Sequence, residues 1–197
     1  LDTFSSPESL WRDVKVMGDH AYVVSEGGGH IQIFDLGDVD NGNVVSRGFT
    51  SFGGSSATHN IIANEDSGYL YRVGGGSDLG LRAYSVGANG TPGSATQPIQ
   101  ASVQSNLYVH DAQVVTYDSG PYAGREIAFC FSGFGNGGTS TTLRIFDVTD
   151  KSNVFLVGSL GSYPGRAYCH QGWLSEDKKY IYMNDELDEG STRSTTT

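Results

Sequence analysis

The chain has 197 residues, and 22 acidic against 12 basic side chains give it a formal net charge of −10. No Lys/Arg cluster offers the positive surface that nucleic acids need, so nucleic acid is not an expected partner. No run of about 18 apolar residues is present, so no transmembrane helix is expected. The 28 glycines and the aromatic content of 11% favour a β-rich domain.

The first half of the chain repeats one order of elements. A strand, a tight turn and a second strand occupy "DVKVMGDHAYVVSEGGG" (13–29), and a third and a fourth strand follow at "HIQIFDL" (30–36) and "NVVSRGFT" (43–50). The same order begins again at "HNIIANEDSGYLYRVGGG" (59–76) and continues with "GLRAYSV" (80–86) and "QPIQASVQ" (97–104). Apolar and polar residues alternate in these tracts, which predicts antiparallel strands.

The second half contains a third unit and the beginning of a fourth. Two strands with a longer turn are predicted in "HDAQVVTYDSGPYAGREIAFCFSG" (110–133), followed by strands at "TLRIFDV" (142–148) and "VFLVGSL" (154–160). "HQGWLSEDKKYIYMNDE" (170–186) begins the fourth unit. The sequence therefore predicts a single domain of repeated strand meanders over residues 1–197, with units at about 11–50, 58–104, 108–160 and 168–197, the last incomplete.

The spacing of the units indicates the architecture. Aligning the first strands places Arg12, His59, His110 and His170 at one position, with intervals of 59−12=47, 110−59=51 and 170−110=60 residues. Units of roughly 40 to 50 residues with four strands each are typical of β-propeller blades. We expect an all-β propeller of four-stranded antiparallel blades, of which this chain supplies about three and a half. A larger ring is expected over a small complete four-bladed one, because an unclosed ring leaves strand edges unpaired.

Several tracts carry a resemblance to a known family. "HDAQ" (110–113), "DVTDKSN" (147–153) and "HQGWLSED" (170–177) followed by "DELDE" (185–189) resemble, in that order, the choice-of-anchor B proteins with LVIVD repeats. The resemblance implies a secreted or cell-surface β-propeller of about seven blades, attached to cells by differing anchors, with this stretch as its central part. It implies no catalytic activity.

The cysteines and one sequon bear on location. Cys130 and Cys169 are an even pair that either forms a disulfide or remains as two buried thiols. Val114 stands where a cysteine often follows "HDAQ" in the family that the chain resembles. Asn89-Gly90-Thr91 is a glycosylation sequon in a Gly/Pro-rich loop. Together these features favour a secreted or cell-surface glycoprotein.

The equivalent first-strand residues are candidates for lining a central channel. His59, His110 and His170 would converge there with Arg12, and three imidazoles are able to hold a transition metal with one coordination position open. The alternative is structural: each histidine bonds the backbone of a neighbouring blade, and a wide channel keeps the imidazoles too far apart to share an ion. Arg12 at the same position argues against a metal ring.

The next residues along the first strands point to the opposite face. Asp13, Asn60, Asp111 and Gln171 are therefore expected to make hydrogen bonds between blades, because buried polar groups need partners. Catalysis by Asp111 is the alternative interpretation. Trp11 and Trp173 are interpreted as blade-packing residues rather than as a sugar platform.

An acidic tract offers a second kind of candidate site. Asp185, Glu186, Asp188 and Glu189 supply oxygen ligands of the kind that calcium uses, although a solvated acidic loop is the alternative. No cofactor is required by the sequence. Calcium or a transition metal is the cofactor that the histidine row and the acidic tract would be able to bind.

Three functions remain open at this point. The leading hypothesis is a non-catalytic extracellular propeller that binds other surface proteins or glycans, or assembles with itself. The alternatives are a metal-dependent hydrolase or lyase, with the histidine row as ligands and Asp111 or Glu186 as general base, and a calcium-stabilised structural module. The sequence favours a non-catalytic protein over an enzyme.

Overall fold

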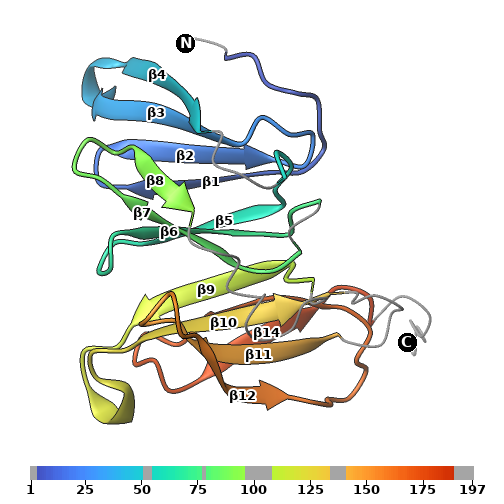
Figure 1. The fold of residues 1–197 in the computed structure, drawn as a ribbon. Coiled ribbons are helices and arrows are strands. Elements are labelled where there is room, and N and C mark those ends of the chain that lie inside the picture. The colour runs from blue at the N-terminus through green and yellow to red at the C-terminus, as the bar shows by residue number, and fades with distance from the viewer. Residues whose placement is uncertain (1–3, 51–54, 77–78, 96–107, 134–140, 189–197) are drawn as a thin grey trace.

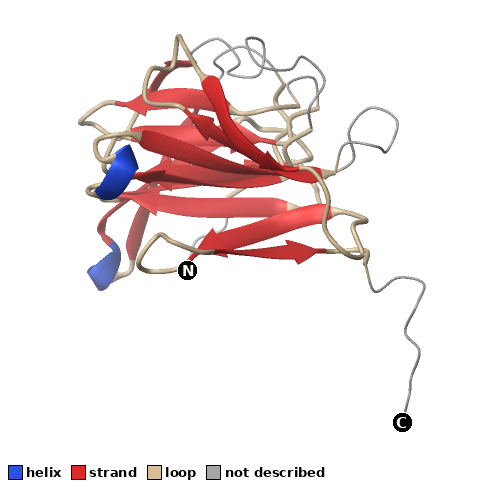
Figure 2. Cartoon of the chain, turned by 90° about the horizontal axis from the view of Figure 1, so that it is seen from below, coloured by secondary structure: helices blue, strands red, loops and turns tan. Residues whose placement is uncertain are grey.

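The computed structural model describes residues 4–50, 55–76, 79–95, 108–133 and 141–188. In these ranges the chain forms antiparallel sheets and contains no α-helix. The helical segments in this part are two short 3-10 helices, η1 (Val39–Asn41) and η2 (Gly120–Tyr122), which lie at the same end of the strands (Figure 2). The all-β class predicted from the sequence is therefore confirmed.

Four sheets follow one another along the chain (Figure 1). The first sheet consists of β1 (Arg12–Met17), β2 (His20–Ser25), β3 (Ile31–Asp38) and β4 (Asn43–Thr50). The second consists of β5 (Asn60–Asn64), β6 (Tyr69–Val73), β7 (Arg82–Val86) and β8 (Pro92–Ala95). The third consists of β9 (Asp111–Thr116), β10 (Glu126–Ser132), β11 (Thr142–Asp147) and β12 (Phe155–Leu160). The fourth, within the described residues, pairs β13 (Cys169–Leu174) with β14 (Ile181–Asp185).

Each sheet is a meander, because its strands lie in chain order from one edge to the other. Short connections make this order the simplest one, and the first hairpin shows how tightly the chain reverses. Met17 pairs with His20, so that Gly18 and Asp19 alone form the turn. Gly18 has a φ of +54°, which a glycine adopts without steric cost at the first position of such a hairpin turn.

One expected strand differs from the structure. The fourth strand of the second unit was predicted at residues 97–104, which lie outside the described residues. The fourth position of that sheet is held instead by β8, in which Pro92 pairs with Val86 and Ala95 with Tyr84. Pro92 is the first residue of this edge strand, where its missing N–H costs no ladder hydrogen bond.

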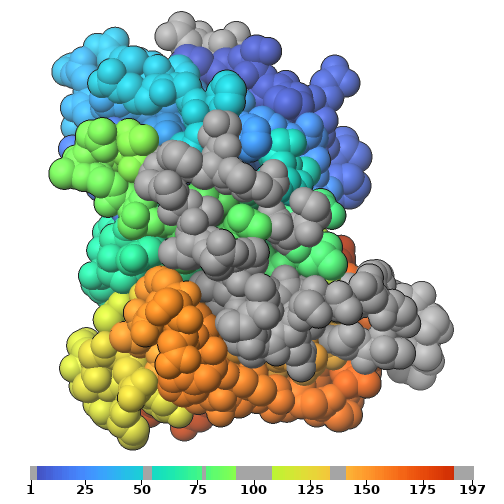
Figure 3. Space-filling view, in the orientation of Figure 1, coloured from blue at the N-terminus to red at the C-terminus, as the bar shows by residue number. Residues whose placement is uncertain are grey.

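The sheets pack face to face, and Figure 3 shows the first three as successive bands of colour. The first strand of each sheet lies against the first strand of the next, in the order β1, β5, β9 and β13. Because side chains alternate between the two faces of a strand, an inner sheet contributes to a core on each side. In β10, Phe129 and Phe131 face the fourth sheet while Ala128 and Cys130 face the second.

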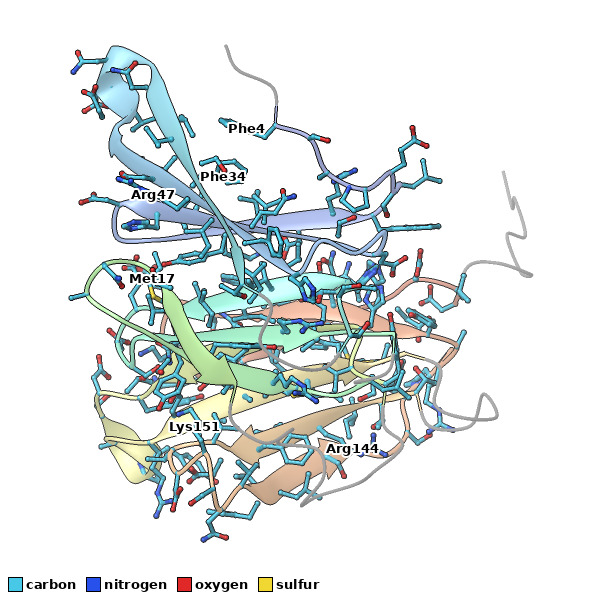
Figure 4. All side chains as sticks on the ribbon, turned by 45° about the horizontal axis from the view of Figure 1, so that its top comes forward. Phe4, Met17, Phe34, Arg47, Arg144 and Lys151 are labelled. Atoms are coloured by element: carbon cyan, nitrogen blue, oxygen red, sulfur yellow. The ribbon has the colours of Figure 1, made fainter. Side chains whose placement is uncertain are left out.

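Three apolar cores result, one between each pair of neighbouring sheets. The core between the first and second sheets contains Tyr22, Val24, Ile31, Ile33, Ile61, Leu70 and Tyr84. The core between the second and third contains, among others, Ile62, Tyr71, Val73, Ala83, Val114 and Phe146. The core between the third and fourth contains Ile127, Phe129, Phe131, Leu143, Cys169 and Leu174. On the outer face of the first sheet, Phe4 from the N-terminal segment lies 4.8 Å from the ring of Phe34 (Figure 4).

The described residues contain no helix with both the length and the apolar character that crossing a membrane would require.

A buried carboxylate joins the second and third sheets. Glu126 is 4% exposed, and its Oε1 accepts hydrogen bonds from Asn64 Nδ2 at 2.7 Å, Ser67 Oγ at 2.7 Å and Tyr71 OH at 2.6 Å. Its Oε2 lies 2.6 Å from the Lys151 ammonium, which is labelled in Figure 4. A buried charge is stable only when it is paired and hydrogen-bonded, and Glu126 meets both conditions.

Removing this carboxylate should destabilise the fold. Glu126→Ala leaves the Lys151 ammonium and three polar groups without their shared acceptor, so we expect the free energy of unfolding to fall by about 3 kcal/mol. Urea denaturation, monitored by tryptophan fluorescence, measures the change in the free energy of unfolding. Glu176→Ala, at an exposed position, is the matched control and should stay within about 0.5 kcal/mol of the parent. Equal stability of the two variants would contradict the assigned role of Glu126.

Candidate functional site

A pocket of about 310 Å³ opens where the first strands begin. This end of the molecule lies opposite the two 3-10 helices, because β9 runs towards η2. Residues from or next to all four sheets line the pocket: Trp11, Glu26, His59, Tyr108, His110, Tyr168, His170, Glu186 and Leu187. We call it the histidine pocket.

Three histidines from three sheets form a row in this pocket. The ring centroids of His59 and His110 are 4.1 Å apart, and those of His110 and His170 are 4.4 Å apart. The Tyr168 ring meets His110 edge-on at 5.3 Å. The structure thus brings together the three histidines that the repeat spacing aligned.

Hydrogen bonds of the row fix which ring nitrogens carry protons. His110 Nδ1 lies 3.0 Å from the backbone oxygen of His170, and His59 Nδ1 lies 2.5 Å from Oε1 of Glu26. A carbonyl or carboxylate oxygen only accepts, so both Nδ1 atoms donate. In the neutral ring, Nε2 is then a lone-pair acceptor. The bond from His110 to the backbone of the next sheet is of the kind that the structural interpretation of the row expects.

His110 is uncharged at neutral pH. Burial and the neighbouring charge of His59 lower its pKa to about 4, although its hydrogen bond to the His170 carbonyl acts in the opposite direction. Burial also raises the pKa of Tyr108 to about 12, helped by the Glu26 carboxylate, so this hydroxyl stays protonated. The centre of the pocket is therefore neutral and polar.

The two ends of the row carry carboxylates. Glu26 pairs with His59 at one end, and at the other Glu186 Oε2 lies 3.7 Å from His170 Nε2. The Glu186 side chain is 53% exposed and that of Glu26 is 34% exposed. The pocket thus combines imidazole acceptors with two carboxylates.

The histidine row does not have the arrangement of a metal centre. Among the described residues, no group of three or more His, Cys, Asp or Glu side chains is placed to hold a metal ion. The rings of His59, His110 and His170 pack side by side.

Arg12 does not join the row. Its guanidinium is exposed and turns to the N-terminal segment, where it bonds to Ser6 Oγ and, at 2.5 Å, to the backbone oxygen of Pro7. Trp11 lines the pocket in its place. The prediction that Arg12 is channel-lining is wrong, because the segment preceding β1 supplies nearby acceptors that attract the side chain.

The polar residues that follow the histidine positions along the first strands have two different roles. Asp13 Oδ2 accepts from the Ile61 backbone N–H at 3.0 Å, and Asn60 Nδ2 donates to the His110 carbonyl at 3.1 Å. These bonds connect β1 to β5 and β5 to β9. Asp111 accepts from the backbone N–H of Ala112 at 2.8 Å, and with Gln171 it lines a second pocket.

The acidic tract is also divided. Asp185 accepts from the Ala167 N–H at 2.9 Å, the Leu187 N–H at 3.1 Å and the Tyr163 hydroxyl at 2.6 Å. Burial acts to raise the pKa of Asp185, but these hydrogen bonds outweigh it and lower the pKa overall. Glu186 turns into the histidine pocket, Asp188 is exposed, and Glu189 lies outside the described residues.

Of the two alternatives for Cys130 and Cys169, the structure shows two buried free thiols and no disulfide between them. The reason is strand alternation: Cys130 faces the core between the second and third sheets, whereas Cys169 faces the core between the third and fourth. Cys169 Sγ contacts Met183 Sδ at 3.5 Å. The sequon residue Asn89 is exposed in the β7–β8 turn, where its Oδ1 accepts from the Thr91 N–H at 3.1 Å.

Several pocket residues were missed from the sequence. The repeated pattern aromatic-x-His in "YVH" (108–110) and "YCH" (168–170) was a signal for Tyr108 and Tyr168. Glu26 follows a second strand and had no such signal. Trp11 is 55% and Trp173 64% exposed, so neither tryptophan is buried between two of the four described sheets, and their packing role stays a prediction.

Comparison with known proteins adds information on the fold alone. No family model and no curated protein matches the chain. The chain is similar to the crystal structure of a functionally unknown protein from Desulfotomaculum acetoxidans DSM 771, with a TM-score of 0.55 and 14% sequence identity over 92% of this chain. The match spans 51% of that protein, so this chain corresponds to about half of its length.

Acidification should destabilise the protein through His110. The folded-state pKa of about 4 lies below the usual value of about 6.5, so the neutral ring stabilises the fold above pH 6.5, and this contribution is lost as the pH falls towards 4. Between pH 7 and pH 4 the parent should lose roughly 2 kcal/mol more unfolding free energy than His110→Gln, which has no proton to bind. Urea titrations at each pH measure this difference. His20→Gln, outside the pocket, controls for the loss of a histidine. If the unfolding free energy of the parent and of His110→Gln changed in parallel with pH, the assignment would be refuted.

The role of Asp185 is separable from calcium binding. Asp185→Asn replaces one carboxylate oxygen by an amide nitrogen, which cannot accept a hydrogen bond. We therefore expect the free energy of unfolding to fall by about 1–2 kcal/mol. Chelation of the parent with EDTA should leave its melting temperature unchanged within about 1 °C. Thermal unfolding with and without EDTA measures both effects. A chelator-sensitive melting temperature that Asp185→Asn abolishes would show instead that the tract holds an ion.

Proposed function

We propose that the four sheets are consecutive blades of a β-propeller and that the protein is a non-catalytic binding module. The meander in each sheet and the contacts between successive first strands support the blade assignment. The similarity to a solved chain about twice as long supports a ring larger than this chain, which we place at about seven blades. In this proposal the chain contributes about three and a half of them.

The location that we propose is secreted or cell-surface. The resemblance of "HDAQ", "DVTDKSN" and "HQGWLSED" to choice-of-anchor B proteins supports it. The exposed position of Asn89 in the β7–β8 turn also fits, because a glycosylation site must be accessible. The free cysteines contribute nothing to this assignment.

The observation that carries the binding proposal is the surplus of hydrogen-bond acceptors in the histidine pocket. The Nδ1 atoms of His59 and His110 are donors to the protein itself, and the neutral ring of His110 presents Nε2 as an acceptor. Glu26 and Glu186 add carboxylate oxygens and negative charge. Such a pocket is complementary to a cation that carries N–H donors.

A primary ammonium group has this chemistry, and it occurs both in free amines and in the lysine side chains of surface proteins. Aromatic rings strengthen the preference, because cations are attracted to the faces of tryptophan and tyrosine. Trp11, Tyr108 and Tyr168 line the same pocket. We therefore propose a primary ammonium, free or on a partner protein, as the ligand.

A catalytic role has less support from the same geometry. No Ser, Thr, Cys or Lys side chain is among the described residues that line the pocket. With a pKa of about 4, His110 is a weak general base at neutral pH. The metal-dependent hydrolase or lyase would need a ligand set that the described residues do not form.

The proposal is tested by calorimetric titration with n-butylammonium, Nα-acetyl-lysine amide and choline. The two primary ammonium compounds should bind, and choline, which has no N–H donor, should bind at least about tenfold more weakly. Binding of the lysine derivative alone would favour a partner protein as the ligand source.

Charge-removing variants assign this binding to the pocket. Glu26→Gln and Glu186→Gln keep the side-chain shape and should each reduce affinity for n-butylammonium by about fivefold or more. Glu176→Gln, which removes the same charge outside the pocket, should leave affinity within about twofold. Absence of binding, or equal losses in all three variants, would refute the proposal.

A further inference from the structure

Two polar side chains of the third sheet each place a polar atom in the interior without a hydrogen bond. Ser132 ends β10, and Arg144, labelled in Figure 4, lies in β11. Arg144 Nη1 and Ser132 Oγ are both shielded from solvent, and among the described residues neither atom has a hydrogen-bond partner. Ser132 as a whole is 0% exposed. Buried polar atoms are nearly always paired, so two unpaired atoms in one sheet point to a bound group.

The two side chains share the face of the third sheet that packs against the second. Arg144 is directly opposite Cys130, and Ser132, two residues further along β10, is opposite Thr142. Cys130 belongs to the core between the second and third sheets, and alternate residues of a strand share a face. Ser132 and Arg144 are therefore diagonal neighbours on this face. Such neighbours are about 7–8 Å apart, which is within reach of a long side chain.

Described sheets cover this place on both sides. The second sheet and the segments next to it contribute Val73, Leu81, Ala83 and Val109 to the same core. These side chains are apolar, so they offer Arg144 no hydrogen bond. Because the place lies between two sheets of this chain, it does not depend on what packs against the outer faces of the first and fourth sheets.

The Arg144 guanidinium also lacks a counter-charge. Among the described residues, no carboxylate forms an ion pair with it. Burial lowers the pKa of Arg144, and the neighbouring Cys130 acts in the opposite direction. Cys130 supplies no negative charge at neutral pH, because burial raises the pKa of its thiol to about 12. An arginine stays protonated in proteins, so the charge that would complete this place is negative.

We propose that Arg144 and Ser132 bind a halide ion such as chloride between the second and third sheets. The Nη1–H of Arg144 and the hydroxyl of Ser132 donate to the ion, and the Cys130 thiol is a weak donor on the same face. A water molecule accepts from the same donors but brings no negative charge. Arg144 is of intermediate exposure, so a small ion is able to reach the site from solvent. The site goes beyond the proposed binding function and uses no residue of the histidine pocket.

Chloride should therefore stabilise the folded protein, because a ligand that binds the native state alone raises the melting temperature with its concentration. Chloride replaces gluconate from about 5 mM to about 300 mM at constant ionic strength, which keeps general screening the same. The melting temperature of the parent should rise by at least about 3 °C, and bromide should act in the same way. A change of less than about 1 °C with both halides would overturn the proposal.

Matched variants assign this response to the site. Ser132→Ala removes a hydroxyl that has no hydrogen-bond partner among the described residues, and Arg144→Met replaces the guanidinium by an apolar chain, so both variants should fold. Each should lose at least about half of the chloride-dependent rise in melting temperature. Arg166→Met removes the same charge at an exposed position and should respond as the parent does. A response of Ser132→Ala equal to that of the parent would contradict the assignment.

Anomalous scattering locates the ion directly. In crystals of the parent soaked in sodium bromide, we expect an anomalous difference peak in contact with Arg144 Nη1 and Ser132 Oγ. Crystals of Ser132→Ala should show a weaker peak at the same position. Ordered water there, with bromide on the surface alone, would overturn the proposal.

Discussion

Side-chain hydrogen bonds between successive first strands are the interaction on which the arrangement of this molecule depends. First strands are sheet edges, and their free backbone groups need partners. Asp13 bonds the Ile61 N–H, Asn60 bonds the His110 carbonyl, and His110 bonds the His170 carbonyl. Each bond connects one sheet to the next. Together they hold four sheet edges side by side at one end of the molecule, which is where the histidine pocket forms.

This use of His110 limits what its pocket is able to do. The same ring packs between two other imidazoles and donates to a neighbouring backbone, so its conformation and tautomer are fixed by the fold. Burial keeps it uncharged. A fixed neutral ring suits recognition of a donor, whereas a general base needs a pKa near the working pH. The stabilising role and the binding role are thus properties of one geometry.

The face-to-face packing of sheets explains where the exposed aromatic residues lie. Each inner sheet buries both faces, which is why Cys130 and Phe131, adjacent in sequence, belong to different cores. The fourth sheet has one face in contact with the third, through Cys169 and Leu174. Its opposite face carries Trp173 and Tyr182, which are 64% and 67% exposed in the described residues.

By itself the sequence determined the strands other than β8, their order in each meander, and the equivalence of His59, His110 and His170, because period-two alternation and turn residues are local properties. Tertiary structure alone decided that Arg12 turns away, that Cys130 and Cys169 stay apart, and that Glu26 and Glu186 close the two ends of the histidine row. These outcomes depend on which sheet faces meet and how closely. Glu26 and His59 are 33 residues apart in the chain, yet Glu26 Oε1 lies 2.5 Å from His59 Nδ1. No local sequence pattern encodes that distance.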